Sequence, residues 1–165
     1  MTQVFSFESD SALTAQAATD IAKLLQLAIS ERGTARLVLT GGTLGIKILA
    51  DLARQGLELN KLEVFFGDER YVPFDHADRN EQQGLDAWPE LASCVLRRFP
   101  DDVQPLAAAA EAFDAEVTDL LGPIASDFAV FDVLVLGMGP DGHIASLFPG
   151  HQHDVKSVSY THLRA

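Results

Sequence analysis

The chain has 165 residues, 47% of them hydrophobic and 22% charged, which is typical of one globular domain with a sizeable core. Twelve basic and 24 acidic residues give a formal net charge of −12, which argues against nucleic acid or an anionic membrane as a partner. No run of about 18 apolar residues occurs, and the first residues do not resemble a signal peptide, so no membrane span is expected. The single cysteine, Cys94, excludes an internal disulfide, and we expect a packed thiol in a cytoplasmic protein.

Strands and helices are expected to alternate along the chain. The first elements are a weak strand at 4–7 and a helix that is capped by Ser9 or Asp10 and ended by Gly33. The others are a strand at 36–40, a helix at 46–54, a strand at 62–66, helical pieces at 81–87 and 89–98, a helix at 107–121 and a strand at 131–136. Five apolar residues suggest that this last strand is buried on both faces. The order predicts an α/β, Rossmann-like domain: a parallel sheet in three layers with helices on both faces.

Three glycine-containing turns each follow a predicted strand, at 40–45, 67–70 and 137–143. The carboxyl ends of parallel strands lie at the same edge of a sheet, and ligands bind there in open α/β folds. We therefore expect the three loops to converge on one crevice.

The first loop, Thr40-Gly-Gly-Thr-Leu-Gly45, precedes a helix. Backbone amides at Gly41, Gly42 and Thr43 together with the helix N-terminus suit a phosphate or an oxyanion. A plain strand-to-helix turn that needs glycine for its backbone angles is the alternative.

The second loop places Asp68, Glu69 and Arg70 in succession, so their side chains cannot all point the same way. One of them can face the crevice while its neighbours anchor the loop. Arg70 suits a bidentate contact with phosphate, and an ion pair with a nearby carboxylate is equally compatible with the sequence.

The third loop carries an acid and a base close together. Residues 137–142 match G-x-G-x-x-G, but Pro149 interrupts the following segment, so a dinucleotide site is not favoured. Asp141 lies two residues from His143, where it can orient the imidazole and leave the other ring nitrogen free as a general base.

Two other kinds of site, a zinc site and a serine nucleophile, are less favoured interpretations of the same segment. A zinc site formed by His143, His151 and His153 is disfavoured, because no carboxylate or cysteine accompanies them at ligand spacing. Ser146 as the nucleophile of a triad lacks the G-x-S-x-G elbow.

The segments Phe65-Phe-Gly-Asp-Glu-Arg-Tyr-Val-Pro73, Asp78-Arg-Asn80 and 137–150 (Gly-Met-Gly-Pro-Asp-Gly-His-Ile-Ala-Ser-Leu-Phe-Pro-Gly) resemble the signature blocks of the 6-phosphogluconolactonase family. Glucosamine-6-phosphate deaminase is similar in all three loops. It has Asp-Glu-Tyr where this chain has residues 68–70, and Ala-Phe-Asn-Glu-Pro where this chain has residues 145–149. Both differences favour the lactonase.

The resemblance implies hydrolysis of 6-phospho-D-glucono-1,5-lactone to 6-phosphogluconate, a step of the oxidative pentose phosphate pathway. His143 would be the general base and Asp141 its orienting partner. The residues expected to bind substrate are Gly41, Gly42, Thr43, Asp68, Glu69, Arg70, Asn80, Gly139 and Gly142. No metal or organic cofactor is expected, and the only expected partner is the sugar-phosphate lactone, with the protein a monomer or weak oligomer. The alternatives are the deaminase or isomerase, and a non-catalytic sugar-phosphate binder of the same fold.

The resemblance covers about residues 2–151, and the family continues further. We therefore expect residues 1–156 to form an incomplete domain without the family's C-terminal strand and helices. We expect residues 157–165 to be a foreign or out-of-frame tail. The last strand would then be an exposed sheet edge, which predicts a poorly soluble product with little or no lactonase activity.

Overall fold

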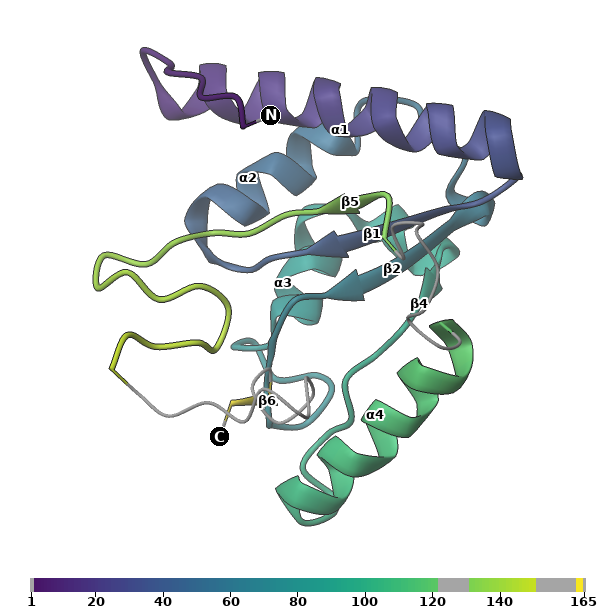
Figure 1. The fold of residues 1–165 in the computed structure, drawn as a ribbon, viewed down its shortest axis with the longest axis vertical. Helices are drawn as coiled ribbons and strands as arrows, with labels where there is room; N and C mark the ends of the chain where they lie inside the picture. The colour runs from purple at the N-terminus through teal and green to yellow at the C-terminus, as the bar shows by residue number, and fades with distance from the viewer. Residues whose placement is uncertain (1, 122–130, 151–162, 165) are drawn as a thin grey trace.

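A computed structural model describes residues 2–121, 131–150 and 163–164. Its centre is a four-stranded sheet of order β4–β2–β1–β5, in which every pair is parallel (Figure 1). The strands are β1 (Ala35–Leu39), β2 (Leu62–Phe66), β4 (Val95–Leu96) and β5 (Val133–Leu134). Leu37 of β1 lies opposite Val64 on one side and Val133 on the other. A second, two-stranded sheet pairs β3 (Glu69–Arg70) with β6 (Leu163–Arg164).

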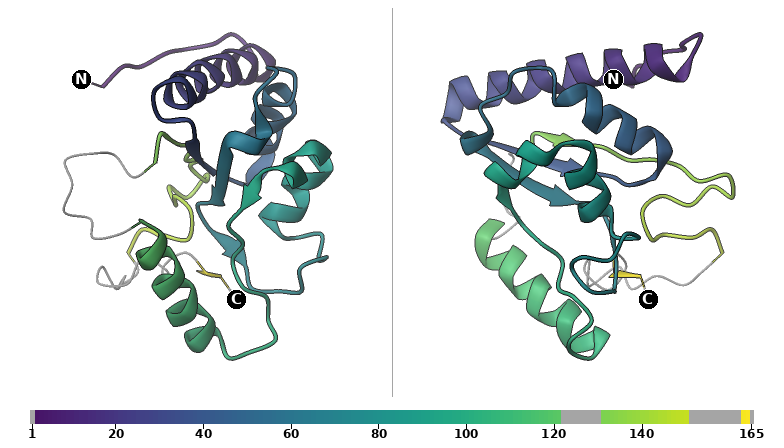
Figure 2. Two further views of the ribbon diagram at one scale, coloured as in Figure 1. Left: turned by 90° about the vertical axis from the view of Figure 1, so that its right-hand side faces the viewer. Right: turned by 180° about the vertical axis from the view of Figure 1, so that it is seen from behind.

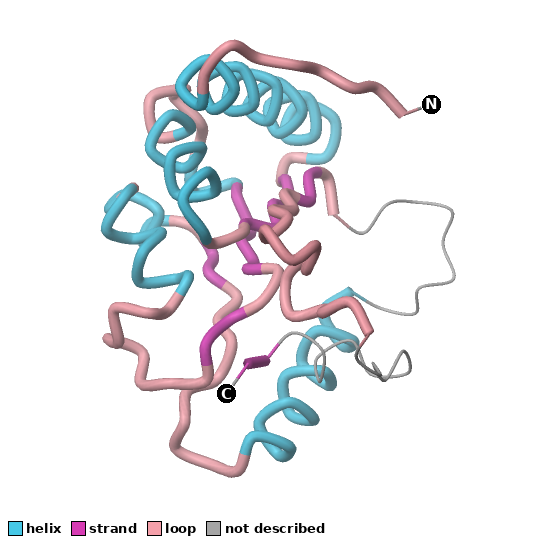
Figure 3. The backbone as a smooth tube through the Cα atoms, turned by 90° about the vertical axis from the view of Figure 1, so that its left-hand side faces the viewer, coloured by secondary structure: helices cyan, strands magenta, loops and turns pink. Residues whose placement is uncertain are grey.

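Helices cover both faces of the central sheet, as predicted. The two helices α1 (Asp10–Arg32) and α2 (Gly42–Leu52) pack together on one face, while α4 (Leu106–Leu121) lies on the opposite side (Figures 1 and 2). Helix α3 (Asn80–Ala87) packs against α2. Short 3₁₀ turns occur at η1 (Leu59–Lys61) and η2 (Pro89–Ser93), and Figure 3 shows helices, strands and loops alternating along the backbone. None of the described helices is long and apolar enough to span a bilayer.

Helix α1 begins and ends where the sequence predicts. The Ser9 side chain accepts a hydrogen bond from the amide of Ala12 (3.2 Å), and Gly33 ends the helix with a φ of 82°. The residues that face the core are Thr14, Ala18, Ile21, Ala22, Leu25, Ala28 and Ile29. They meet the central positions of β1 and β2, such as Leu37 and Val64, which are fully buried. Cys94 joins this core as a packed thiol, and burial raises its pKa to about 11.

Two predicted elements are wrong. Residues 4–7 do not form a strand, and Val4 and Phe5 are 87% and 70% exposed, because this short alternating segment meets no partner strand within the described residues. The helical piece predicted at 89–98 is a single 3₁₀ turn that leads into β4. Pairing of Val95 with Glu63 and a bond from the Arg97 amide to the Val64 carbonyl (2.9 Å) draw this segment into the sheet.

The last predicted strand is also less buried than its sequence suggests. Strand β5 lies at the edge of the described sheet, and Leu134 and Leu136 are each 53% exposed. An apolar run indicates a strand, but it does not show how many of its faces are covered. The prediction of burial on both faces is therefore wrong, whereas the edge position agrees with the expectation for the last strand.

Candidate active site

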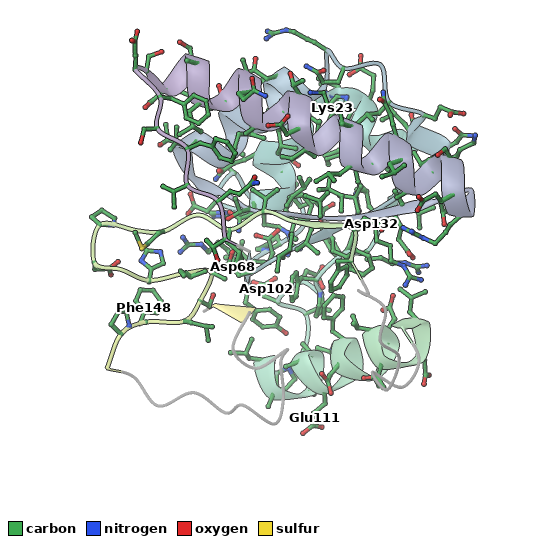
Figure 4. All side chains as sticks on the ribbon, turned by 45° about the horizontal axis from the view of Figure 1, so that its top comes forward. Lys23, Asp68, Asp102, Glu111, Asp132 and Phe148 are labelled. Atoms are coloured by element: carbon green, nitrogen blue, oxygen red, sulfur yellow. The ribbon has the colours of Figure 1, made fainter. Side chains whose placement is uncertain are left out.

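The three loops meet at the carboxyl ends of β1, β2 and β5, as predicted, around a cavity of about 410 Å³. Its lining residues come from all three loops and from the start of α3: Thr40, Gly41, Gly42, Thr43, Leu44, Gly45, Asp68, Arg70, Asn80, Gly137, Met138, Gly139, Pro140, His143 and Ala145. In Figure 4 the labelled residues Asp68 and Phe148 lie on the side where the 137–150 loop projects.

The first loop contributes the N-terminus of α2. The helix begins at Gly42, four residues earlier than predicted, with Gly41 as its N-cap, so the first-turn amides have no acceptor within the helix. Gly41 also lies directly against Asn80: a Cβ at this position would lie 1.9 Å from Asn80 Oδ1. The amides of Gly42 and Thr43 therefore border the cavity at a helix end, an arrangement suited to an anion.

Asp68 is a buried carboxylate that borders the cavity, with 8% of its surface exposed. Its Oδ1 accepts a hydrogen bond from Asn80 Nδ2 (3.2 Å), and its Oδ2 accepts one from the Ser146 hydroxyl (2.9 Å). Asn80 Nδ2 also donates to the Asp68 backbone carbonyl (2.9 Å). Asp68 thus contacts side chains from α3 and from the third loop.

Glu69 does not line the cavity, contrary to the prediction that it binds substrate. It is 1% exposed and points into the protein, where its carboxylate accepts bonds from the amides of Arg70 (2.8 Å), Asn80 (2.6 Å) and Glu81 (2.9 Å). Burial raises the pKa of this carboxyl, while the backbone donors and the Arg79 guanidinium oppose the rise. Consecutive side chains in an extended segment point in opposite directions, which turns Glu69 inward beside the cavity-lining Asp68 and Arg70.

Arg70 is the one lysine or arginine among the described residues that line the cavity. None of the ion pairs found in the described part of the chain includes Arg70. The alternative prediction, an ion pair between Arg70 and a nearby carboxylate, is therefore not met there. An exposed guanidinium beside a helix N-terminus can bind an anion without first breaking an internal salt bridge.

The third loop holds the predicted acid and base in contact. His143 Nδ1 lies 2.5 Å from Asp141 Oδ1, and hydrogen bonding from His143 lowers the pKa of Asp141. A carboxylate can only accept, so Nδ1 carries the proton and Nε2 is left unprotonated in the neutral ring. The imidazole stacks on Phe148, with ring centroids 4.7 Å apart and planes inclined by 24°.

Gly139 and Gly142 have different places in this loop. A Cβ on Gly139 would lie 2.2 Å from His143 Cε1, so only glycine lets the backbone pass this close to the imidazole. The amide of Gly139 also donates to the His143 carbonyl (2.9 Å). Gly142 is not a lining residue; its amide closes a turn onto the Gly139 carbonyl (2.9 Å), so its predicted contact with substrate is not supported.

Sequence reasoning missed the part that Arg79 has in building the site. Arg79 is fully buried and donates to the carbonyls of Val72 (3.0 Å), Phe99 (2.8 Å) and Pro100 (3.4 Å). Its Nε lies 3.7 Å from Glu69. The only signal was its place between Asp78 and Asn80 in the second signature block, because a polar loop gives no indication that an arginine within it is buried.

The zinc interpretation finds no support in the described ranges, where no group of three histidine, cysteine or acidic side chains could hold a metal ion. His151 and His153 lie outside the described residues.

The model of the family of glucosamine-6-phosphate isomerases and 6-phosphogluconolactonase matches residues 8–163. The chain belongs to this family. The 6-phosphogluconolactonase of Pseudomonas putida is 43% identical over 141 residues, covering 83% of this chain and 54% of that protein. The one of Mycobacterium leprae is 36% identical over 152 residues, covering 87% of this chain and 61% of that protein.

Solved structures agree with the family membership. The 6-phosphogluconolactonase of Trypanosoma brucei superposes with a TM-score of 0.79 at 28% identity, covering 92% of this chain and 65% of that one. The enzyme of Shewanella baltica gives 0.76 at 30% identity, covering 90% and 62%. The chain therefore spans about half to two thirds of the length of these family members. The boundary at residue 156 stays a prediction.

Proposed function

We propose that this site hydrolyses 6-phospho-D-glucono-1,5-lactone to 6-phosphogluconate. The observation that carries the proposal is that His143, hydrogen-bonded to Asp141, lines the same cavity as Arg70 and the N-terminus of α2. The pair supplies a base, and the other two features supply an anion site. A sugar-phosphate lactone needs both at once.

His143 Nε2 takes a proton from a water molecule as that water attacks the lactone carbonyl carbon. The negative charge that develops on the carbonyl oxygen requires a donor, and the free amides at the start of α2 are candidates for this oxyanion or for the phosphate. The bond from the carbonyl carbon to the ring oxygen then breaks, and the ring oxygen receives the proton that His143 took up. The product is the open-chain acid.

Asp141 supports this cycle through charge. Because hydrogen bonding from His143 keeps the pKa of Asp141 low, the carboxylate remains charged while the imidazole becomes protonated, and it stabilises the imidazolium. Asn80 and Asp68 hold the second loop against α2 and the third loop. In this proposal Arg70 binds the phosphate, and Gly139 lets the imidazole lie close to the backbone.

Stacking of Phe148 on His143 supports the lactonase over the deaminase. The deaminase pattern places a carboxylate after the histidine segment, whereas here an apolar ring covers one face of the imidazole. Hydrolysis of the ester requires a base, a water molecule and an oxyanion site. The single buried cysteine is compatible with the cytoplasmic location that we propose for this activity.

The test is lactone hydrolysis by the 165-residue chain and by the same chain joined to the C-terminal part of the Pseudomonas putida relative, since the chain covers 54% of that protein. We expect turnover above the spontaneous rate in the joined protein, its loss in His143→Gln, and low turnover in the 165-residue chain. A folded joined protein without turnover would refute the proposal, as would full turnover in His143→Gln. Faster release of ammonia from glucosamine 6-phosphate would establish the deaminase instead.

A further inference from the structure

We infer that Ser146 is a positioning residue: its hydrogen bond to Asp68 holds the loop that carries His143 at a fixed place relative to the anion site. The catalytic consequence rests on the function proposed above, whereas the placement of the imidazole can be measured without turnover.

The contact joins two segments that are distant in the sequence. The Ser146 hydroxyl donates to Asp68 Oδ2 at 2.9 Å, across 78 residues of chain. Asp68 is buried, and Asn80 holds its other carboxylate oxygen, so the acceptor is itself fixed from the side of α3. Charge-assisted hydrogen bonds of this kind are roughly twice as strong as neutral ones.

Three apolar side chains of the 137–150 loop are exposed in the described part of the chain. Met138 is 76% exposed, and Ile144 and Leu147 are each 37% exposed. Its backbone bonds connect residues of the loop to one another, as in the turn where Leu147 donates to the Ile144 carbonyl (2.9 Å). Within the described part of the chain, the bond from Ser146 is the side-chain hydrogen bond that joins this loop to the end of β2.

Ser146 lies at the tip of that turn, three residues after His143. Ala145, which precedes it, has a φ of 50°, an unusual conformation for a residue with a side chain, and it lines the cavity. A strained residue persists where surrounding contacts fix it, and the Ser146 bond is a contact of this kind. The turn, the imidazole and the Asp68–Arg70 segment are thereby set in one arrangement.

The geometry favours positioning over nucleophilic attack. A nucleophilic serine needs a base within hydrogen-bonding distance of its hydroxyl. The Ser146 hydroxyl donates to Asp68, and among the described residues no hydrogen bond joins it to His143, the base of the proposed reaction. The serine therefore acts on His143 through the loop, not by proton transfer.

Two variants of matching shape isolate the hydroxyl: Ser146→Thr keeps the donor and Ser146→Val removes it. Nitrogen-15 NMR chemical shifts of the imidazole ring, recorded on the full chain with isotope-labelled histidine, report the tautomer of His143. The signal that is missing from the His143→Gln spectrum belongs to His143. We expect S146T to keep the single tautomer protonated on Nδ1. We expect S146V and S146A to show averaged nitrogen shifts, because the turn at 144–147 is no longer fixed to Asp68 and the neighbouring imidazole then turns away from Asp141 part of the time. Ser93→Ala, which changes an exposed serine on η2, is the control and should leave the signals unchanged.

In the protein joined to the relative's C-terminal part, S146V and S146A should lower kcat/KM by about a hundredfold relative to S146T, mostly through kcat, the size of effect that a displacement near 1 Å produces. Parent-like nitrogen shifts in S146V would overturn the inference, and so would equal shifts in S146T and S146V. A global loss of structure in S146V would also overturn it, because the serine would then support the whole fold. If the parent shows no turnover, the proposed function fails, while the tautomer comparison still decides the role of Ser146.

Discussion

Replacing Glu69 with alanine should destabilise the protein strongly, although Glu69 does not line the cavity. The carboxylate accepts hydrogen bonds from the amides of Arg70, Asn80 and Glu81, which caps the N-terminus of α3 from a different loop. At about 1 kcal/mol for each lost bond, the three amides together cost about 3 kcal/mol.

The loss of charge adds to this cost. Arg79 is fully buried, and its Nε lies 3.7 Å from Glu69, while its Nη2 lies 3.5 Å from Glu81. Removing a whole buried partner costs about 3–5 kcal/mol; because Glu81 remains, we assign about 1–2 kcal/mol here. The sum of about 4–5 kcal/mol is a large part of the 5–15 kcal/mol that stabilises a typical domain. The thermal midpoint should fall by about 10–20 °C.

Chemical denaturation and hydrogen exchange check this prediction. Glu69→Gln keeps the side-chain shape and one acceptor oxygen, so its unfolding free energy should fall by about half as much as that of Glu69→Ala. Glu90→Gln, at an exposed position, should change the unfolding free energy by less than about 0.5 kcal/mol. The amides of Asn80 and Glu81 should lose protection first in E69A. A loss under about 1 kcal/mol with protected amides would show that Glu69 does not cap α3.

The same residue predicts a pH dependence. Because burial raises the pKa of Glu69, the folded state binds its proton more readily than the unfolded state. This carboxyl therefore lowers stability as pH rises from its ordinary pKa to the raised one, and the slope should be absent in E69Q. The measurement compares the unfolding free energies of the parent and of E69Q across the pH range between the ordinary and the raised pKa of Glu69. Equal slopes would contradict the direction of the shift.

The remaining predictions concern the cavity and the sheet edge. Arg70→Met should weaken binding of 6-phosphogluconate by about tenfold to a hundredfold in calorimetry with an unchanged thermal midpoint, and equal affinity would remove Arg70 from the anion site. Asp141→Asn should reduce kcat at least about a hundredfold by favouring the wrong tautomer. In the parent, the Asp141 contribution to kcat should be present above the ordinary aspartate pKa and lost only as pH falls through the lowered one; loss at the ordinary value would contradict the shift. Gly139→Ala should displace the imidazole of His143 and lower kcat with little change in thermal midpoint; parent-like turnover would contradict the close approach. Leu134→Lys should slow aggregation in light scattering by placing a charge on the edge strand, and an unchanged rate would locate aggregation elsewhere.

The convergence of the three loops followed from the sequence because it depends only on the strands being parallel. Once the segments at 36–40, 62–66 and 131–136 are assigned as parallel strands, the residues after them must share one edge of the sheet. The spacing of Asp141 and His143 similarly left few arrangements in which the two side chains do not meet. Local caps at Ser9 and Gly33 fixed the ends of α1 for the same reason, since they act within a few residues.

Features that depend on distant partners were not predictable in this way. Three consecutive residues such as 68–70 cannot all point in one direction, as the sequence alone indicates. That Glu69 is the residue that points inward depends on α3, which begins 11 residues later. The segment after Pro89 carries a helical pattern, yet β2 offers it a strand partner, and tertiary pairing overrides local preference. The sequence offered Ser146 only as a disfavoured nucleophile, because its hydrogen-bonding partner lies 78 residues away.

A net charge of −12 opposes the binding of an anionic ligand, but the groups around the cavity differ from this average. Each carboxylate near the cavity is engaged: Asp68 with Asn80 and Ser146, Glu69 with backbone amides, and Asp141 with His143. Arg70, by contrast, enters none of the ion pairs found among the described residues, and the amides at the start of α2 face the same cavity. Hydrogen bonds to a carboxylate partly offset its charge at short range, while a guanidinium outside these ion pairs keeps its full field there. The proposed phosphate site thus combines Arg70 with the amides at the start of α2, while the Asp68 carboxylate that borders it is hydrogen-bonded within the protein.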